Sequence, residues 1–237
     1  MSLGVFSFFL PHTPPSGKPG DPLPFVKALG LFRDPSFAVF FGVSFVITIV
    51  LSFYYNFTGL YLEQAHGVKA VASTMIWGQV AETVLLPLLP LFLWYMGMKW
   101  VLALGMFAWG LRYAFFAVGQ PYPLVFLGIL LHGVCFDFFF AAGFIHVDNE
   151  APKDIRASGQ ALFGFLTYGL GMFIGSIVGG YLGKALTTTT AVDGKPVDVT
   201  DWATFWWVPS VGVLASLAIF IVFFRMHKRA DVPAGAA

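Results

Sequence analysis

Long apolar segments separated by short polar ones dominate the pattern of this chain. Six of them run for about 20 residues or more, and each predicts a helix that crosses a bilayer. Their expected bounds are Ser36–Tyr61, Ser73–Met96, Lys99–Val118, Pro123–His146, Ala157–Gly183 and Ala203–Phe224. We therefore predict an all-α membrane protein whose six transmembrane helices form one bundle over residues 36–225.

The segments outside this bundle have different compositions. Residues 1–10 are apolar but too short to cross a membrane, and we expect them to be the end of a helix that begins earlier. Residues 11–35 are rich in proline and glycine, which excludes a regular helix and predicts a cytoplasmic linker. Residues 226–237 are expected to form a cytoplasmic tail. The long polar connection Lys184–Trp202 carries no recognisable motif.

Composition restricts the class of protein further. Only 11% of the 237 residues are charged, whereas a soluble domain has roughly 25%, so the lipid bilayer is the expected surrounding. The net charge of +1 gives no footprint for nucleic acid. The single cysteine, Cys135, provides neither a disulfide framework nor a cysteine metal cluster.

The distribution of basic residues predicts the orientation of the chain. Of the 13 Lys and Arg residues, nine flank the spans on one side, three lie on the other, and Arg112 lies within a span. The nine are Lys18, Lys27, Arg33, Lys99, Lys153, Arg156, Arg225, Lys228 and Arg229. Because basic loops stay cytoplasmic, we expect a multi-pass protein of the plasma (inner) membrane with both termini in the cytoplasm.

Strongly polar residues lie inside the spans, where they are costly and mark functional sites by default. They are Gln79, Glu82, His132 and Asp137. With a helical rise of about 1.5 Å per residue, Glu82 and His132 both lie near the midplane, where transporters bind substrate and coupling ion. Gln79 and Glu82 are three residues apart and share a helix face. The pattern favours transport.

Burial gives these residues several candidate roles. It disfavours the charged form of a carboxylate, so Glu82 and Asp137 are candidate proton carriers. The structural alternatives are an ion pair between Asp137 and a basic residue, and an interhelical hydrogen bond from Glu82. For Arg112, snorkelling to the interface or structural pairing stands against a role in substrate binding or gating.

Aromatic and amide side chains near the end of the first span, including Tyr55 and Asn56, suit a flat polar ring such as a nucleobase. An interfacial aromatic belt is the alternative. Enzyme chemistry is not indicated, because the chain has neither an HExxH pattern nor a G-x-S-x-G elbow. His132 and Asp137 are five residues apart, which disfavours a metal site with Glu82. We expect no enzyme, cofactor or metal.

Four glycines at a strict spacing of four residues run along the fifth span: Gly171, Gly175, Gly179 and Gly183. Small residues on one helix face allow another helix to approach closely. This glycine stripe predicts either ordinary packing inside the six-helix bundle or contact with a second bundle.

Four motifs occur in order: Gly78-Gln79-Val80-Ala81-Glu82, Trp109-Gly110-Leu111-Arg112-Tyr113, Gly133-Val134-Cys135-Phe136-Asp137-Phe138-Phe139 and Ile155-Arg156-Ala157-Ser158-Gly159-Gln160. Together they resemble the nucleoside–proton symporters of the major facilitator superfamily, in particular the C-terminal half. The resemblance implies two six-helix bundles with nucleoside bound between them and import driven by protons. Residues 1–10 would then be the end of a truncated sixth helix, and the glycine stripe would face the N-terminal bundle.

The resemblance also implies roles for individual residues. Gln79 and Glu82 would contact the nucleoside, Phe136 would stack near the base, and Asp137 would serve substrate binding or proton coupling. His132 stands where the better-known members have Tyr. Either Tyr55 or Asn56 would occupy the polar position of the first span.

A second half is needed for alternating access. An N-terminal six-helix half would come from the same gene, from a partner chain or from a homodimer. We expect the first, a truncated gene or misassigned start, because Met1 falls inside an expected helix. The alternatives for function are a major facilitator transporter of another small polar solute, and a non-transporting half-length remnant or assembly partner.

Overall fold

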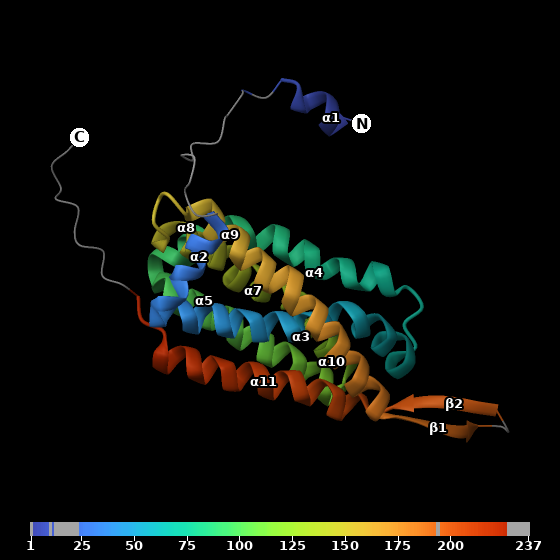
Figure 1. The fold of residues 1–237 in the computed structure, drawn as a ribbon. Coiled ribbons are helices and arrows are strands. Elements are labelled where there is room, and N and C mark those ends of the chain that lie inside the picture. Colours follow the sequence, from blue (N-terminus) through green and yellow to red (C-terminus); the bar gives the residue numbers. More distant parts are fainter. Residues whose placement is uncertain (1, 10, 12–23, 193–194, 227–237) are drawn as a thin grey trace.

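A computed structural model describes residues 2–9, 11, 24–192 and 195–226 (Figure 1). Five helical segments in this part of the chain are long and apolar enough to cross a membrane. One of them, Val71–Val118, is 48 residues long and reverses direction at Gly97, so it crosses twice. The structure is thus a bundle of six antiparallel passes, as the hydropathy pattern predicts.

The first pass is helix α3, Pro35–His66. It begins after Asp34, whose carboxylate accepts hydrogen bonds from the N–H groups of Ser36 and Phe37, and it ends at Gly67 in the left-handed conformation (φ 64°). Both ends follow ordinary capping rules, a carboxylate at the start and a glycine after the last turn.

Short helical segments precede α3. They are α1 (Ser2–Ser7), α2 (Pro24–Ala28) and the 3₁₀ helix η1 (Leu29–Arg33). The prediction of a linker without helix is therefore wrong over residues 24–33. Pro24 stands in the first turn of α2, where its missing N–H costs nothing, and no proline follows until Pro35. The expected linker residues 12–23, and residues 227–237 of the expected tail, lie outside the described residues.

The second and third passes join without a loop. They comprise α4 (Val71–Leu85), the 3₁₀ turn η2 (Leu86–Leu88) and α5 (Leu89–Val118). Within α5, Gly97 adopts φ 73° and ψ 163°, a conformation open to glycine and strained for other residues. The chain turns back there (Figure 1). The boundary between these two spans falls where the sequence predicts it.

Of the remaining passes, the fourth and fifth contain irregular turns and the sixth is one continuous α-helix. The fourth consists of α6 (Tyr122–Leu130), α7 (His132–Cys135), η3 (Phe136–Ala141) and α8 (Ala142–Glu150); the fifth of α9 (Arg156–Gly164), η4 (Phe165–Gly171) and α10 (Met172–Ala185); the sixth of α11 (Trp202–Phe223). Both η3 and η4 are π-helical. Such turns inside α-helices often occur at functional sites, and hydropathy does not reveal them.

The polar connection between the fifth and sixth passes forms a hairpin. Strands β1 (Thr187–Val192) and β2 (Lys195–Thr200) pair antiparallel, with Thr187 opposite Thr200. The hairpin projects beyond the end of the bundle (Figure 1). Runs of Thr and Val favour strand, so this segment departs from the all-α expectation outside the bundle.

The glycine stripe of the fifth pass faces α3. A Cβ on Gly175 would overlap the carbonyl oxygen of Ile49 and the hydroxyl of Ser52, and a Cβ on Gly179 would lie 3.1 Å from ring atoms of Phe53. All four glycines are buried. The prediction that the stripe contacts a second bundle is therefore wrong, because close packing inside this bundle already uses it.

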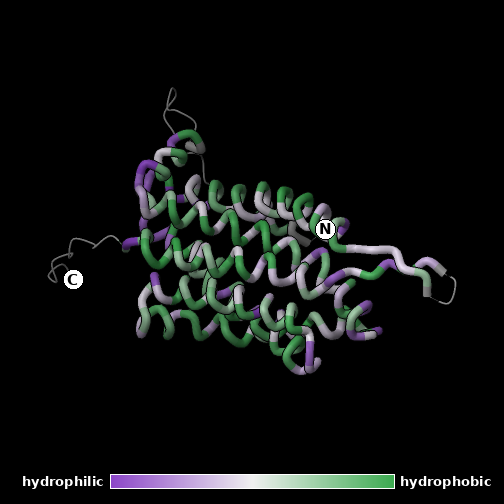
Figure 2. Tube along the Cα trace, turned by 90° about the horizontal axis from the view of Figure 1, so that it is seen from below, coloured by the Kyte–Doolittle hydropathy of each residue, from purple (hydrophilic) through white to green (hydrophobic). Residues whose placement is uncertain are grey.

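Hydrophobic residues follow the lengths of the helices, and hydrophilic ones gather at their ends (Figure 2). One end holds α2, the α8–α9 connection and the end of α11, whereas the hairpin lies at the other (Figure 1). The turn at Gly97 belongs to the first end, because Lys99 donates a hydrogen bond to the carbonyl of Phe224. Lys99 and Arg156, two of the nine basic residues that the sequence predicts on the cytoplasmic side, lie at the first end. That this end faces the cytoplasm stays a prediction.

Candidate functional site

Close contact between α4 and α7 places the polar residues of two passes side by side. A Cβ on Gly133 would lie 2.6 Å from the carbonyl carbon of Ala81 and 2.7 Å from the nitrogen of Glu82, and one on Gly78 would lie 3.0 Å from His132 Cβ. Two glycines thus allow the backbones to touch. As a result, the Oε2 atom of Glu82 lies 3.7 Å from the Nε2 atom of His132.

Glu82 and His132 differ in exposure. The side chain of His132 is 1% exposed and that of Glu82 is 29% exposed. Gln79, one turn before Glu82 on α4, is exposed. The carboxylate of Glu82 therefore lies where the packed interior meets a partly exposed surface that also carries Gln79, Tyr55 and Tyr168, here called the open face.

Arg112 of α5 is completely buried. Its Nη1 atom lies 3.1 Å from His132 Nδ1, and its guanidinium carbon lies 3.3 Å from the centre of the Tyr54 ring. A cation over an aromatic face is stabilised by the ring's charge distribution. The snorkelling hypothesis for Arg112 is therefore wrong, because the side chain turns inward to His132 and Tyr54. Sequence spacing gives no signal for this pairing across three helices.

Asp137 lies in the π-helical turn η3 and is 1% exposed. Its Oδ2 atom has no hydrogen-bond partner in the structure. Among the described residues it takes part in no ion pair, so the alternative of a structural salt bridge has no support there. A buried carboxylate oxygen without a partner is costly, so Asp137 stays a candidate for substrate binding or proton coupling.

Aromatic rings surround the polar cluster. The Phe136 ring centre lies 5.7 Å from that of His132, and the Tyr55 ring stands edge-on to His132 at 6.3 Å. Tyr168, in the second π-helical turn, packs 6.4 Å from Phe136. Tyr55 is 45% and Tyr168 38% exposed. The sequence interpretation missed Tyr168, although a tyrosine at mid-span in a glycine-rich helix is an available signal.

Asn56 belongs to a different neighbourhood from Tyr55. Its Nδ2 atom donates a hydrogen bond to the Ser176 hydroxyl of α10 at 3.0 Å, and both residues are exposed. Of the two candidates at the end of the first span, only Tyr55 has a ring contact with the His132 cluster. The structure thus brings Glu82, His132, Phe136 and Tyr55 together and leaves Asn56 beside α10.

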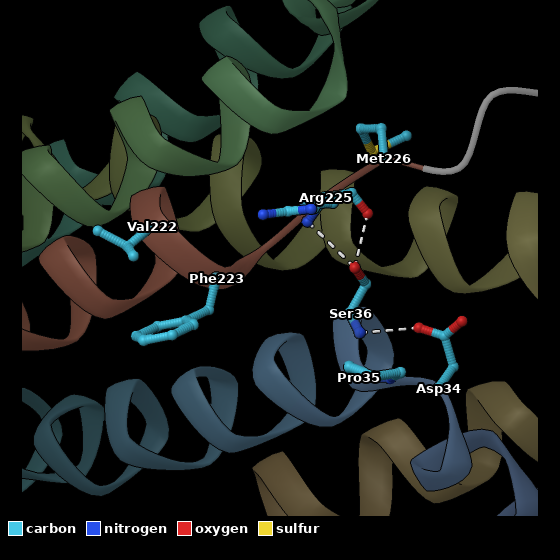
Figure 3. A pocket seen from close by; sticks show the side chains of 7 residues that line it. All are labelled: Asp34, Pro35, Ser36, Val222, Phe223, Arg225 and Met226. Atoms are coloured by element: carbon cyan, nitrogen blue, oxygen red, sulfur yellow. Dashed lines mark hydrogen bonds between the residues drawn. The ribbon is translucent and has the colours of Figure 1, made fainter.

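The His132 cluster is separate from the hollow at the end of the bundle. Among the described residues no group of three His, Cys, Asp or Glu side chains is placed to hold a metal ion. A hollow of about 540 Å³ lies at the end of the bundle where α3 begins and α11 ends (Figure 3). There the Ser36 hydroxyl donates to the carbonyl of Arg225 at 2.7 Å. None of the predicted site residues lines this hollow.

Six apolar passes around an acid–histidine–arginine cluster form one half of a fold of the major facilitator type. The chain belongs to the nucleoside H⁺ symporter family, whose model matches residues 1–229. It is 38% identical over 232 residues to the putative nucleoside transporter YegT of Escherichia coli, covering 94% of this chain and 54% of that protein. Nucleoside permease NupG of Escherichia coli is 30% identical over 251 residues, covering 98% and 58%.

The solved structures agree with this assignment. The chain superposes on the crystal structure of the nucleoside transporter NupG with a TM-score of 0.72 and 28% identity, covering 95% of this chain and 58% of that one. A mutant form of the same transporter gives a TM-score of 0.76. A further relative by sequence, the xanthosine permease of Escherichia coli, is 32% identical over 216 residues, covering 85% of this chain and 50% of that protein. This chain spans about half the length of its curated relatives.

Proposed function

We propose that this chain forms the C-terminal half of a nucleoside–proton symporter that imports nucleosides across the inner membrane. The observation that carries the proposal is the position of Glu82. Its carboxylate reaches the open face of a membrane-spanning bundle, beside a buried histidine whose ring contacts those of Phe136 and Tyr55. Membership of the nucleoside H⁺ symporter family supports the same substrate class.

The open face offers both kinds of contact that a nucleoside needs. The rings of Phe136, Tyr55 and Tyr168 supply flat surfaces for stacking with a base. Gln79 and Glu82 supply hydrogen-bond donors and acceptors for polar edges. Stacking gives affinity for any base, and the polar groups fix its orientation.

In this proposal Glu82 and Asp137 carry the coupled proton. Both carboxyl groups lie in membrane-spanning helices, where the neutral form is favoured over the charged one. Asp137 is buried with an unpartnered oxygen, whereas Glu82 faces the substrate side. A proton taken up by either group neutralises it, and its release in the other access state completes the coupling.

The second half of the transporter is a six-helix N-terminal bundle. Alternating access requires one bundle to move against another around a central site, and the curated relatives are about twice as long as this chain. With both termini in the cytoplasm, the linker of residues 11–35 would join the two bundles on the cytoplasmic side.

Uptake of labelled uridine and adenosine tests the proposal in cells that produce the chain together with an N-terminal half. Glu82→Gln and Asp137→Asn are expected to abolish uptake at unchanged expression, whereas Glu63→Gln, an exposed acid near the end of α3, serves as the control. Wild-type rates in both variants would contradict the site assignment. Failure of every nucleoside to compete, within a panel of polar solutes, would contradict the substrate class.

A further inference from the structure

The contact between Arg112 and His132 determines where the imidazole ring carries its proton. A guanidinium group has N–H donors and no acceptor. The Nη1 atom of Arg112 lies 3.1 Å from His132 Nδ1, so Nδ1 must be the acceptor and holds no proton. The proton of the neutral ring is then on Nε2.

The ring is also held in one orientation. It stacks on Tyr54 with ring centres 5.2 Å apart and planes 19° from parallel, and Phe136 packs 5.7 Å away. Tyr54 at the same time covers the guanidinium group of Arg112. These neighbours keep Nδ1 toward Arg112 and Nε2 toward Glu82.

The Nε2 atom has no hydrogen-bond partner, although the histidine is fully buried. Its distance to Glu82 Oε2 is 3.7 Å, which is too long for a direct hydrogen bond. A buried donor without a partner is unfavourable. A group that both donates and accepts would satisfy the two atoms at once, and a hydroxyl has both capacities.

We propose that Arg112 is a positioning residue that fixes His132 as an Nε2–H donor, and that this N–H and the Glu82 carboxylate together bind one hydroxyl of the transported solute. The Glu82 side chain, which is 29% exposed, turns outward to admit the hydroxyl, which then donates to Glu82 and accepts from His132. The identification of the solute as a nucleoside rests on the proposed function, and the group is then a hydroxyl of its sugar. Arg112 itself does not touch the solute.

Nitrogen-15 NMR of the full chain in lipid nanodiscs tests the positioning step without any ligand. Histidine is labelled, and the His132 signals are identified by their loss in His132→Gln. In the wild type Nδ1 is expected to be unprotonated and Nε2 protonated. Arg112→Met should give a mixture of both tautomers, and Tyr113→Phe, which removes only the neighbouring hydrogen bond to Val50, should not. A protonated Nδ1 in the wild type would overturn the proposal.

Competition by deoxy analogues tests the hydroxyl step in the uridine uptake assay. Uridine lacking one of its three hydroxyls is expected to compete about 10- to 100-fold more weakly than uridine, as for loss of a hydrogen bond to a charged group. In His132→Phe this difference should shrink by about 2- to 10-fold, because only the hydrogen bond to Glu82 remains. His132→Gln, which keeps an N–H donor, should retain the full difference, and an unchanged difference in His132→Phe would refute the role of His132.

The outcomes separate the two proposals. Uridine uptake with all three deoxy analogues competing as well as uridine would refute the hydroxyl assignment and leave the proposed function intact. Absence of nucleoside uptake would refute the proposed function and the hydroxyl assignment together. The protonation of Nδ1 and Nε2 of His132 in the ligand-free wild type tests the role of Arg112 independently of any uptake measurement.

Discussion

The glycine at position 133 is the residue on which the geometry of the site depends most directly. A methyl group in Gly133→Ala would lie 2.6 to 2.8 Å from three backbone atoms of Ala81 and Glu82. Ordinary contact begins at 3.4 Å, so α4 would have to move by about 0.8 Å. Backbone atoms have no rotamer by which to escape, unlike the end of a side chain.

The cost can be isolated with a second glycine. Overpacking of a well-packed core costs about 1–3 kcal/mol, and alanine gains about 0.8–1.0 kcal/mol over glycine from helix propensity. Gly180→Ala in α10 has the same gain, because nothing lies within 4 Å of its added Cβ. The difference between the two variants is therefore the overpacking term, about 1–3 kcal/mol in the free energy of unfolding.

Denaturant titration of both variants in mixed micelles measures this difference. Gly133→Ala should be less stable than Gly180→Ala by that amount and should also lose affinity for uridine, since separation of α4 from α7 pulls Glu82 away from His132. Equal stability of the two variants would refute the close packing of α4 on α7. A destabilised variant with unchanged affinity would refute its role in the site.

Two predictions concern the ends of α11. Lys99 Nζ donates to the carbonyls of Ile221 and Phe224 at 2.8 and 2.7 Å, so Lys99→Met should lower the free energy of unfolding by about 1–3 kcal/mol, with exposed Lys153→Met as a neutral control. At the other end, hydrogen bonds from Thr204 lower the pKa of Asp201. The stabilisation that Asp201 contributes is therefore complete above its pKa in the unfolded chain, about 3.9, and is lost as the pH falls through its lower pKa in the folded protein. Asp201→Asn should flatten this pH dependence of the free energy of unfolding, measured by acid unfolding curves.

The passes of the bundle could be predicted from the sequence because lipid imposes a strong constraint on length and hydropathy. The reversal at Gly97 falls at the expected break, since a glycine and the following Lys99 interrupt the apolar run. By contrast, the direction in which a residue faces depends on packing between helices. From the sequence, the glycine stripe could pack inside this bundle or against a second bundle. The structure shows that it packs against α3.

For the candidate site, too, depth in the membrane could be predicted from the sequence, whereas contacts between helices could not. Depth along the helices placed Glu82 and His132 at one level from sequence alone, and the structure puts them 3.7 Å apart. Arg112 was unpredictable because its partners, His132 and Tyr54, lie on two other passes. Tyr168 was missed since its place beside Phe136 depends on two π-helical turns, whose extra residue changes the face that a helix presents.

Gradient-driven accumulation of uridine tests the central claim most directly. Proteoliposomes that hold the protein with its N-terminal half are given an inward proton gradient, and labelled uridine inside is followed with and without a protonophore. We predict accumulation by the wild type that the protonophore abolishes, and none by Glu82→Gln or Asp137→Asn. Gradient-driven accumulation at the wild-type level in both variants would contradict the account.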